Sequence, residues 1–434
     1  MTAQRVVIVG GGFAGLAAAK GLRRSSDVQI TLIDRRNHHL FQPLLYQVAM
    51  AGLSPADIAA PIRGILSDQS NVQVLQGEVS SVDLNAQQVF VEPIASPAES
   101  GSESIDYDYL ILACGASHSY FGKPQWEQHA PGLKTLEQAT EIRRRVLSAF
   151  EQAERATDPE LQRQLLTFVV IGGGPTGVEL AGAIGEMSRH TLAKDFRRID
   201  SSLARIILVE GGPRILPMFD PALSSRATRD LEKLGVQVWT SSIVSDVSDA
   251  GVNVGEEHIR SATVLWAAGV EASKLGRKLD LPTDKVGRVI VHPDLSVEGA
   301  PNVFIAGDQA HFAVNGSPLP GVAPVAMQQG RFLANNIRRE LDGQLRMDFE
   351  YIDKGKMATI GRSKAITQVG NRKFSGLFAW IVWLVVHIYY LTGFRNRLFV
   401  VISWAWSYLT YRRGARLIVG KNWQTLRSSQ NETK

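Results

Sequence analysis

The stretch from Arg5 to Gly15 reads RVVIVGGGFAG and decides the fold. Its first half is a run of apolar, mostly β-branched residues, which predicts a buried strand. A Gly-x-Gly-x-x-Gly pattern on Gly10, Gly12 and Gly15 follows, and an Ala- and Leu-rich helical segment then continues to about Arg24. Glycines at these positions allow a tight turn and close approach of a pyrophosphate, and the helix N-terminus stabilises the phosphate charge.

The next strand, Val28–Ile33, ends at Asp34, whose carboxylate is placed to bind a ribose hydroxyl. A glycine pattern alone is a weak signal, because glycine-rich turns are common. Here a strand precedes the pattern, a helix follows it, and an acid closes the next strand. Together these features favour a dinucleotide site over a plain strand–helix turn.

The same design returns later in the chain. Its strand, glycine loop and second strand are Phe168–Ile171, the glycines Gly172, Gly174 and Gly177, and Arg205–Val209. Glu210 then stands where the acid is expected, although the spacing exceeds the usual ~20 residues. A carboxylate there would repel a 2′-phosphate and favour NADH over NADPH, whereas the nearby Arg214 weakens that preference.

Two such units imply two dinucleotides, with FAD in the first and NAD(H) in the second, so that hydride can pass from nicotinamide to flavin. We therefore predict an α/β fold with two Rossmann-like dinucleotide-binding domains and a C-terminal helical membrane-anchoring region. The FAD-binding domain is expected at 1–122 and 291–345, the NAD(H)-binding domain at 123–290, and the membrane-association region at 346–434.

Composition excludes several other classes. The 47 Lys and Arg residues only slightly outnumber the 42 Asp and Glu residues, and no nucleic-acid module is visible, so no nucleic-acid partner is expected. The single cysteine, Cys114, rules out an intrachain disulfide or redox cysteine pair, and a buried structural thiol is expected. The nine histidines are scattered without metal-ligand spacing, so no metal is predicted. The chain begins without a secretory signal, which favours the cytoplasm.

The C-terminal region is apolar, aromatic and basic. Leu377–Phe394 is uncharged and just at the lower limit for a membrane span, and Leu398–Tyr411 is too short to span. A second helical stripe in the first segment carries polar-tipped side chains typical of interfacial anchors: Trp380, Trp383, His387 and Tyr390. We considered a buried core helix and a transmembrane hairpin, and favour an in-plane monotopic anchor, with one spanning helix as the alternative.

At this point the chain resembles the type II NADH:quinone oxidoreductases, the non-proton-pumping NADH dehydrogenases of the two-dinucleotide-binding flavoprotein superfamily. The resemblance covers nearly the whole length. It is carried by Gly10–Gly15 with Asp34, Phe41–Ala49, Gly172–Gly177 with Glu179, Val303–Asp308 and Ala323–Gln329.

The resemblance implies that the protein oxidises NADH by hydride transfer to FAD and reduces a membrane quinone to quinol without pumping protons. It also implies a homodimer that contacts the bilayer surface through its C-terminal helices, at the cytoplasmic face of the membrane. Three alternatives remain: a plasto- or phylloquinone-type acceptor, a small electron-transfer protein as acceptor, and a flavoprotein that senses NADH without turnover.

Roles for individual residues also follow from the resemblance. Asp308 is expected to bind the flavin ribitol, and Glu179 to lie where nicotinamide meets flavin. Gln328 and then Gln329 are the candidates for the quinone site, since Pro324 replaces the first glutamine of the family pattern. The catalytic set is Glu179, Gln328 and Gln329. The cofactor-binding set is Gly10, Gly12, Phe13, Ala14, Gly15, Asp34, Arg35, Gln47, Ala113, Gly115, Asp308, Gln328, Gly172, Gly174, Pro175, Thr176, Gly177, Glu179, Glu210 and Gly269.

Overall fold

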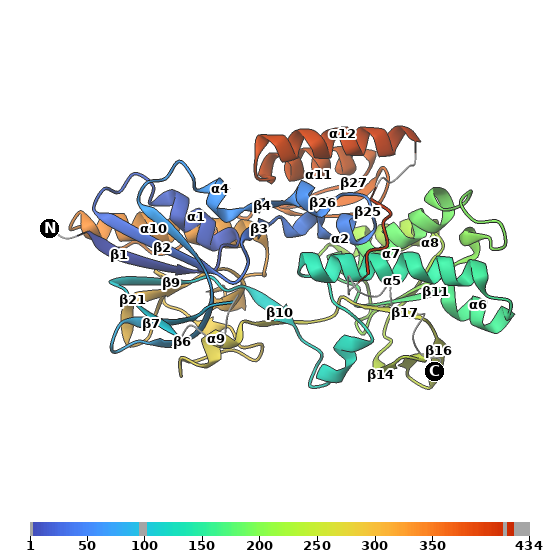
Figure 1. Cartoon of the computed structure of the whole chain (residues 1–434), viewed down its shortest axis with the longest axis horizontal. Helices are drawn as coiled ribbons and strands as arrows, with labels where there is room; N and C mark the ends of the chain where they lie inside the picture. The colour runs from blue at the N-terminus through green and yellow to red at the C-terminus, as the bar shows by residue number, and fades with distance from the viewer. Residues whose placement is uncertain (1–2, 95–101, 411–414, 421–434) are drawn as a thin grey trace, which may run out of the picture. The chain divides into compact units, whose positions relative to one another are not determined.

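The computed structural model describes residues 3–94, 102–410 and 415–420, which form two compact units (Figure 1). The first unit comprises Met1–Leu40, Ala59–His118 and Val270–Lys354, and the second comprises Phe41–Ile58, Ser119–Gly269 and Gly355–Lys434. The boundaries of these two units differ from those of the predicted domains. Residues 270–290 fold with the Gly10 loop, and the C-terminal helices fold with the Gly172 loop. The assignment of FAD and NAD(H) to particular ranges stays a prediction.

The first unit is built on a six-stranded sheet in the order β20-β21-β9-β1-β2-β5. All neighbouring pairs are parallel except β20 with β21. The strands are β1 (Gln4–Val9), β2 (Val28–Asp34), β5 (Val72–Gln76), β9 (Tyr109–Leu112), β20 (Ser296–Val297) and β21 (Ala300–Ile305).

Alternation along β1 explains the layers on either side of this sheet. Val6 and Ile8 pack with residues of helices α1 (Phe13–Gly21) and α10 (Ala323–Leu341), which lie side by side. Val7 and Val9 face the other way and pack with β7 of a three-stranded antiparallel sheet. That sheet consists of β6 (Glu78–Asp83), β7 (Gln88–Glu92) and β8 (Glu103–Asp106). Because both faces are covered, the central strands carry unbroken apolar runs, VVIV at the end of β1 and YLIL in β9, rather than alternating with polar residues.

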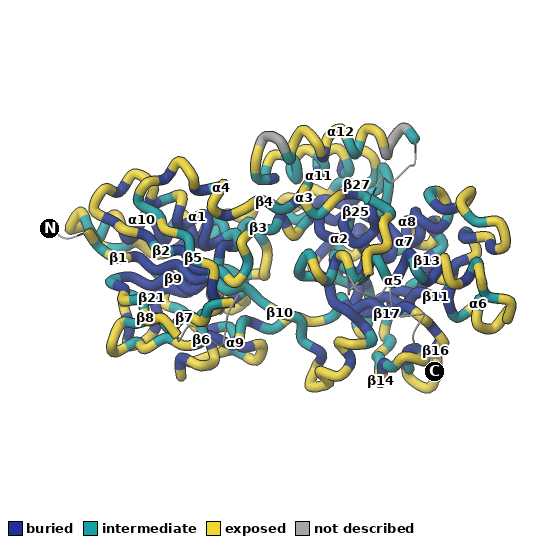
Figure 2. Tube along the Cα trace, in the orientation of Figure 1, coloured by how far each residue is buried: buried dark blue, intermediate teal, exposed yellow. Residues whose placement is uncertain are grey.

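The second unit repeats the parallel design in a four-stranded sheet ordered β13-β12-β11-β17. The strands are β11 (Thr167–Ile171), β12 (Arg205–Val209), β13 (Val236–Trp239) and β17 (Thr263–Trp266), and the main helices are α5 (Leu136–Arg155), α7 (Pro175–Glu186) and α8 (Pro221–Glu232). The long spacing before Glu210 arises because α7 continues into a π-helical turn, Met187–Thr191, and a 3-10 turn, Ser201–Leu203. The predicted α/β fold with two Rossmann-like units is confirmed, and buried strands form the core of each (Figure 2).

An antiparallel sheet from late in the chain packs onto α7 in the same unit. Its strands are β25 (Lys356–Gly361), β26 (Lys364–Val369) and β27 (Arg372–Gly376). Strand β25 passes α7 at Gly182, where a Cβ would lie 1.9 Å from the Ile360 carbonyl oxygen. Close packing of strand and helix therefore depends on the missing side chain. Helix α2 (Leu45–Ala49) also packs against α5 and α7.

Smaller elements complete the fold. They are β3 (His38–Leu40), β4 (Ala59–Pro61), β10 (Ala116–His118), β14 (Val244–Ser248), β15 (Gly251–Val254), β16 (Glu257–Arg260), β18 (Val270–Ala272), β19 (Val289–Ile290), β22 (Ala310–His311), β23 (Ala313–Val314), β24 (Ser317–Pro318), α3 (Pro55–Ile58), α4 (Ile62–Ile65), α6 (Pro159–Leu165), α9 (Lys274–Arg277), and the 3-10 turns Gln42–Leu44, Pro124–Gln128 and Gly307–Gln309.

The chain then forms α11 (Leu377–Tyr390) and α12 (Phe394–Thr410). The predicted interfacial stripe is wrong for Trp383, which is only 2% exposed. Its ring stacks on His387 at 4.2 Å and lies 5.6 Å from Trp404, so these aromatic groups pack against each other instead of facing outward. Within the described residues, no helix has both the length and the hydropathy that crossing a membrane requires.

Candidate functional site

The Gly10 loop has the geometry of a phosphate cradle. Gly10 has φ +107°, and a Cβ there would lie 2.3 Å from the Ala113 carbonyl oxygen. A Cβ on Gly15 would lie 1.9 Å from the Gly10 carbonyl oxygen, so the start of α1 can approach the strand only because that residue is glycine. At Gly12, by contrast, no heavy atom of the described chain lies within 4 Å of the Cβ position, apart from the adjoining backbone. The backbone is thus open at the position that a pyrophosphate would approach.

Asp34 fastens this loop at the end of β2. One of its carboxylate oxygens accepts a hydrogen bond from the Gly11 amide at 2.6 Å, and the other accepts one from the Arg36 amide at 2.7 Å. Arg35 lies beside Glu78, with 3.9 Å between their charged groups. The Phe13 ring meets the buried His39 edge-on, with centroids 5.0 Å apart, and Ala14 is buried in the packing of α1 against α10.

The second loop repeats the first almost atom for atom. Gly172 has φ +108°, and a Cβ on Gly177 would lie 1.8 Å from the Gly172 carbonyl oxygen, while the Cβ position of Gly174 is again open among the described residues. Glu210 accepts hydrogen bonds at 2.6 Å from both the Gly173 and the Gly212 amides.

The residues that follow this loop begin α7. Pro175 takes the first turn of α7, where its missing amide proton costs nothing, and Thr176 follows it. The residues present therefore fit a dinucleotide pyrophosphate in each unit.

The Gly307–Asp308 turn and the glutamines of α10 lie together in the first unit. The Gln329 side chain is buried, and its oxygen accepts a hydrogen bond from the Gly307 amide at 2.7 Å. The Gln328 side chain both donates to and accepts from the Ile352 backbone at 3.0 Å. Gln329 therefore shapes the turn that carries Asp308, and Gln328 holds a neighbouring segment. Their predicted place beside a quinone, and that of Asp308 beside the ribitol, stay predictions.

Cys114 follows β9, between Ala113 and Gly115. Burial raises the pKa of its thiol to about 12, and its sulfur lies 3.8 Å from the Val9 carbonyl oxygen. A thiol in this state is neutral at physiological pH and a poor nucleophile. Gly115 has φ +70°, and its carbonyl accepts a hydrogen bond from the Ser273 amide.

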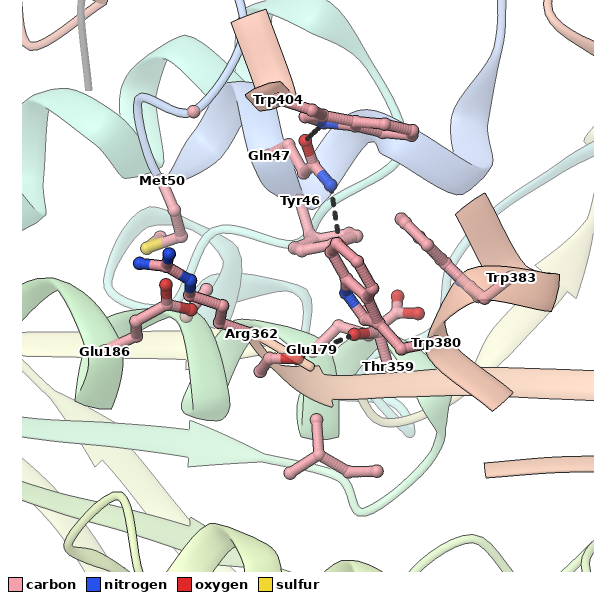
Figure 3. Close-up of a pocket in the computed structure, with 14 residues that line it drawn as sticks. Tyr46, Gln47, Met50, Glu179, Glu186, Thr359, Arg362, Trp380, Trp383 and Trp404 are labelled. Atoms are coloured by element: carbon pink, nitrogen blue, oxygen red, sulfur yellow. Dashed lines mark hydrogen bonds between the residues drawn. The ribbon is translucent and has the colours of Figure 1, made fainter. Parts of the chain in front are cut away.

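A pocket in the second unit contains Glu179, a residue of the predicted catalytic set (Figure 3). Its walls come from α2, α7, β25, α11 and α12. The lining residues are Tyr46, Gln47, Met50, Gly52, Glu179, Ala183, Glu186, Thr359, Ile360, Gly361, Arg362, Trp380, Trp383 and Trp404. Three tryptophans thus form an aromatic wall, and the two acids and Arg362 supply the charged groups. Figure 3 shows Trp380 near Glu179, and Arg362 near Glu186.

Glu179 has a perturbed acidity. Removal of its carboxyl group from water raises its pKa to about 8, and a backbone hydrogen bond from Thr359 opposes that rise only partly. The carboxyl group therefore holds a proton at neutral pH, as a proton donor requires.

Gln47 is placed in this pocket by a hydrogen-bond chain. Its amide oxygen accepts from the Trp404 indole at 2.6 Å, and its amide nitrogen donates to the Tyr46 hydroxyl at 2.9 Å. Gln47 was predicted as a cofactor-binding residue, and the structure gives it these partners. The sequence did not single out Trp404 or Arg362 as pocket residues. The only signal for Trp404 was the aromatic density after residue 375, which predicted a membrane anchor, and no sequence pattern pointed to Arg362.

Gly269, the last predicted cofactor-binding residue, follows β17 in the second unit. Its φ is +81°, and a Cβ there would lie 2.7 Å from the Phe121 ring. Phe121 was not singled out from the sequence.

Two glycine loops, each fastened by an acid at the end of the next strand, define an oxidoreductase of the two-dinucleotide class. A family model described as pyridine nucleotide-disulphide oxidoreductase matches residues 4–330, and one described as NDH2 C-terminal domain matches residues 354–413. The chain belongs to the type II NADH:quinone oxidoreductases, within the pyridine nucleotide-disulphide oxidoreductase family. With only Cys114, however, it cannot form the intrachain disulfide of the wider family's name.

The chain is similar to individual members of this family over most of their length. The chain is 48% identical to the type II NADH:quinone oxidoreductase Ndh of Mycobacterium tuberculosis, covering 94% of this chain and 89% of that protein. It is 30% identical to the type II NADH:quinone oxidoreductase of Staphylococcus haemolyticus, with 86% and 91% covered. A solved structure of NDH2 from Plasmodium falciparum in complex with NADH has the same fold, with TM-score 0.87, 20% identity, and 96% and 100% covered.

Proposed function

We propose that this protein oxidises NADH by hydride transfer to FAD and reduces a membrane quinone to quinol without pumping protons. The observation that carries the proposal is the pair of matching loops, one in each unit, each open at its middle glycine and fastened by an acid. When bound, FAD supplies the chemistry that accepts a hydride and releases two electrons. The chain's own residues bind the two nucleotides, exclude water and handle the protons.

Glu210 selects NADH as the donor. Its carboxylate is held by two backbone amides at the end of β12, where it would repel the 2′-phosphate of NADPH. Arg214, which could have offset this charge, instead donates to the Pro217 carbonyl at 2.9 Å. The guanidinium group is thereby tied to its own loop, which favours discrimination against NADPH.

The pocket around Glu179 suits a quinone head group, whereas Gln328 and Gln329, the glutamines that the resemblance assigns to the quinone, bond to the Ile352 and Gly307 backbone. Three tryptophans supply flat apolar surface, and the Glu179 carboxyl group offers a proton to the reduced quinone. Trp380 and Trp383 belong to α11 and Trp404 to α12. These helices also carry exposed apolar side chains, so a quinone dissolved in lipid would have a short path to the pocket.

The protein binds the lipid surface through α11 and α12. Their outward side chains are large and apolar: Leu377, Phe378, Ile381, Val385 and Tyr389 on α11, and Leu398, Phe399, Val401, Ile402 and Trp406 on α12. Exposed large apolar side chains gathered on two neighbouring helices mark a membrane or protein contact, and an in-plane anchor fits two short helices. We place this surface at the cytoplasmic face of the membrane, and propose a homodimer, which sedimentation of the detergent-extracted protein would test.

Steady-state oxidation of NADH, and in parallel of NADPH, with a short-chain quinone tests the function. We expect rapid quinone-dependent oxidation of NADH and little use of NADPH. Turnover with a small electron-transfer protein but not with any quinone would contradict the acceptor, and NADH binding without turnover would contradict an enzymatic role.

A further inference from the structure

The second unit contains a strained turn at residues 120–123, ahead of strand β11 in the chain. The Lys123 amide donates to the Tyr120 carbonyl at 3.0 Å, which closes a four-residue turn. Its two central residues, Phe121 and Gly122, have φ of +51° and +82°. Positive φ at both positions defines a type I′ turn, whose first central position favours Asn, Asp or Gly. A bulky residue such as Phe is strained there, because its Cβ crowds the backbone.

Burial does not offset this strain. Phe121 is 67% exposed, whereas its neighbours Tyr120 and Trp266 are buried. The Phe121 ring touches only the edge of the aromatic cluster, with its centroid 5.9 Å from that of Trp266. It also lies over Gly269, where a Cβ would come within 2.7 Å of the ring. Strained residues cluster at active sites and ligand contacts, so this exposed ring is a candidate ligand contact.

The position of Gly269 relates this ring to the nucleotide loop. The residues after β17 run past the nucleotide loop, since the Ala267 amide donates to the Ile171 carbonyl at 2.7 Å and a Cβ on Gly172 would lie 2.6 Å from the Ala267 carbonyl carbon. Glu210, which marks the adenosine side, follows β12 on the opposite side of β11. A dinucleotide that crosses the strand ends at the loop therefore carries its nicotinamide half toward β17.

We propose that Phe121 is a stacking platform that positions the nicotinamide ring of NADH. The left-handed backbone at Phe121 holds the phenyl ring at the carboxyl end of β17. The phenyl ring fits there because Gly269 has no side chain. A planar heteroaromatic ring can then stack offset against the phenyl ring. This assignment rests on the proposed binding of NADH to the second unit.

Two variants separate the ring from the turn. Phe121→Asn removes the ring but suits the left-handed position, so the turn should fold at least as well. Phe121→Tyr keeps the ring. Equilibrium binding of NAD⁺ and of ADP-ribose is measured on each full-length, FAD-loaded protein. ADP-ribose is the matched control because it lacks the nicotinamide.

We expect Phe121→Asn to weaken NAD⁺ binding about three- to tenfold, the size of one aromatic contact, with ADP-ribose affinity unchanged. Phe121→Tyr should bind both as the unsubstituted protein does. Equal weakening of NAD⁺ and ADP-ribose, or no change in either, would overturn the stacking role. If the unsubstituted protein bound neither probe, the proposed function itself would fail.

Discussion

Asp34 and Glu210 each accept two backbone hydrogen bonds of 2.6–2.7 Å. One comes from a glycine of the loop, Gly11 or Gly173, and the other comes from the amide two residues after the acid itself. Both carboxylates are therefore fixed in place before a nucleotide arrives. Preorganisation of this kind lowers the entropic cost of binding and sharpens selectivity. At the scale of single residues, the choice of NADH over NADPH thus depends on the Glu210 carboxylate at the end of β12.

Removing that charge should relax the choice of donor. For Glu210→Gln, we expect the preference for NADH over NADPH in kcat/KM to fall roughly tenfold, equivalent to about 1.4 kcal/mol, because the repulsion of the 2′-phosphate is lost. Asp34→Asn is the matched control in the other unit. It should weaken FAD retention and leave the donor preference unchanged. An unaltered NADH preference in Glu210→Gln would contradict this role.

Glu179 should impose a pH dependence on quinone reduction. Because its pKa is raised from 4.5 to about 8, the protonated form is lost as the pH rises through about 8, and the reoxidation of reduced flavin by quinone should slow there. Glu179→Gln should remove this inflection and lower the rate by roughly 10²-fold, a common contribution of a positioned acid. Stopped-flow reoxidation across pH measures it. The matched control, Glu186→Gln, lines the same pocket and should keep the inflection.

The same shift predicts a change in stability. A raised pKa means that the folded state binds more protons than the unfolded state between pH 4.5 and about 8. As the pH rises through that window, the free energy of unfolding of the unsubstituted protein should therefore fall relative to that of Glu179→Gln. Thermal melting of the two proteins across pH would show this. Parallel melting curves at every pH would contradict the raised pKa of the Glu179 carboxyl group.

At the scale of elements, the contact of β25 with α7 holds the Glu179 pocket together. Gly182→Ala would place a Cβ 1.9 Å from the Ile360 carbonyl oxygen, so the strand must move. We expect a loss of about 1–3 kcal/mol in the free energy of unfolding, measured by denaturant titration. Gly64→Ala on the exposed face of α4 is the control: its Cβ meets nothing in the described chain closer than 4.0 Å and should be neutral or stabilising. Equal stability of the two variants would contradict this packing.

The strands and glycine loops could be predicted because their signals are local. Apolar runs, glycines and a closing acid lie within about 40 residues of one another, and the backbone conformation of each glycine is set by its immediate neighbours. The pocket could not be predicted in this way. Gln47, Glu179 and Trp404 are separated by more than a hundred residues, and only tertiary packing brings them together. Trp383 shows the same limit, since helical periodicity reveals a stripe of residues but not whether it faces protein or lipid.

At the scale of the whole molecule, the exposed apolar side chains of α11 and α12 should determine membrane binding. A double variant, Ile381→Asp with Ile402→Asp, should reduce co-flotation with phosphatidylglycerol vesicles about tenfold or more, because two charges replace exposed apolar side chains that the bilayer would cover. The control is Leu203→Asp, which changes an exposed leucine elsewhere in the second unit. If the double variant floated as well as the control, another surface would bind the lipid.

The central claim is that one chain passes electrons from NADH through FAD to a quinone. Sequential anaerobic mixing tests it most directly: the FAD-loaded protein is mixed with NADH and then with a short-chain quinone, while flavin absorbance is followed. We predict rapid bleaching by NADH and full recovery of the oxidised spectrum with one equivalent of quinone. Bleaching without recovery on addition of quinone, or no bleaching by NADH, would contradict the account.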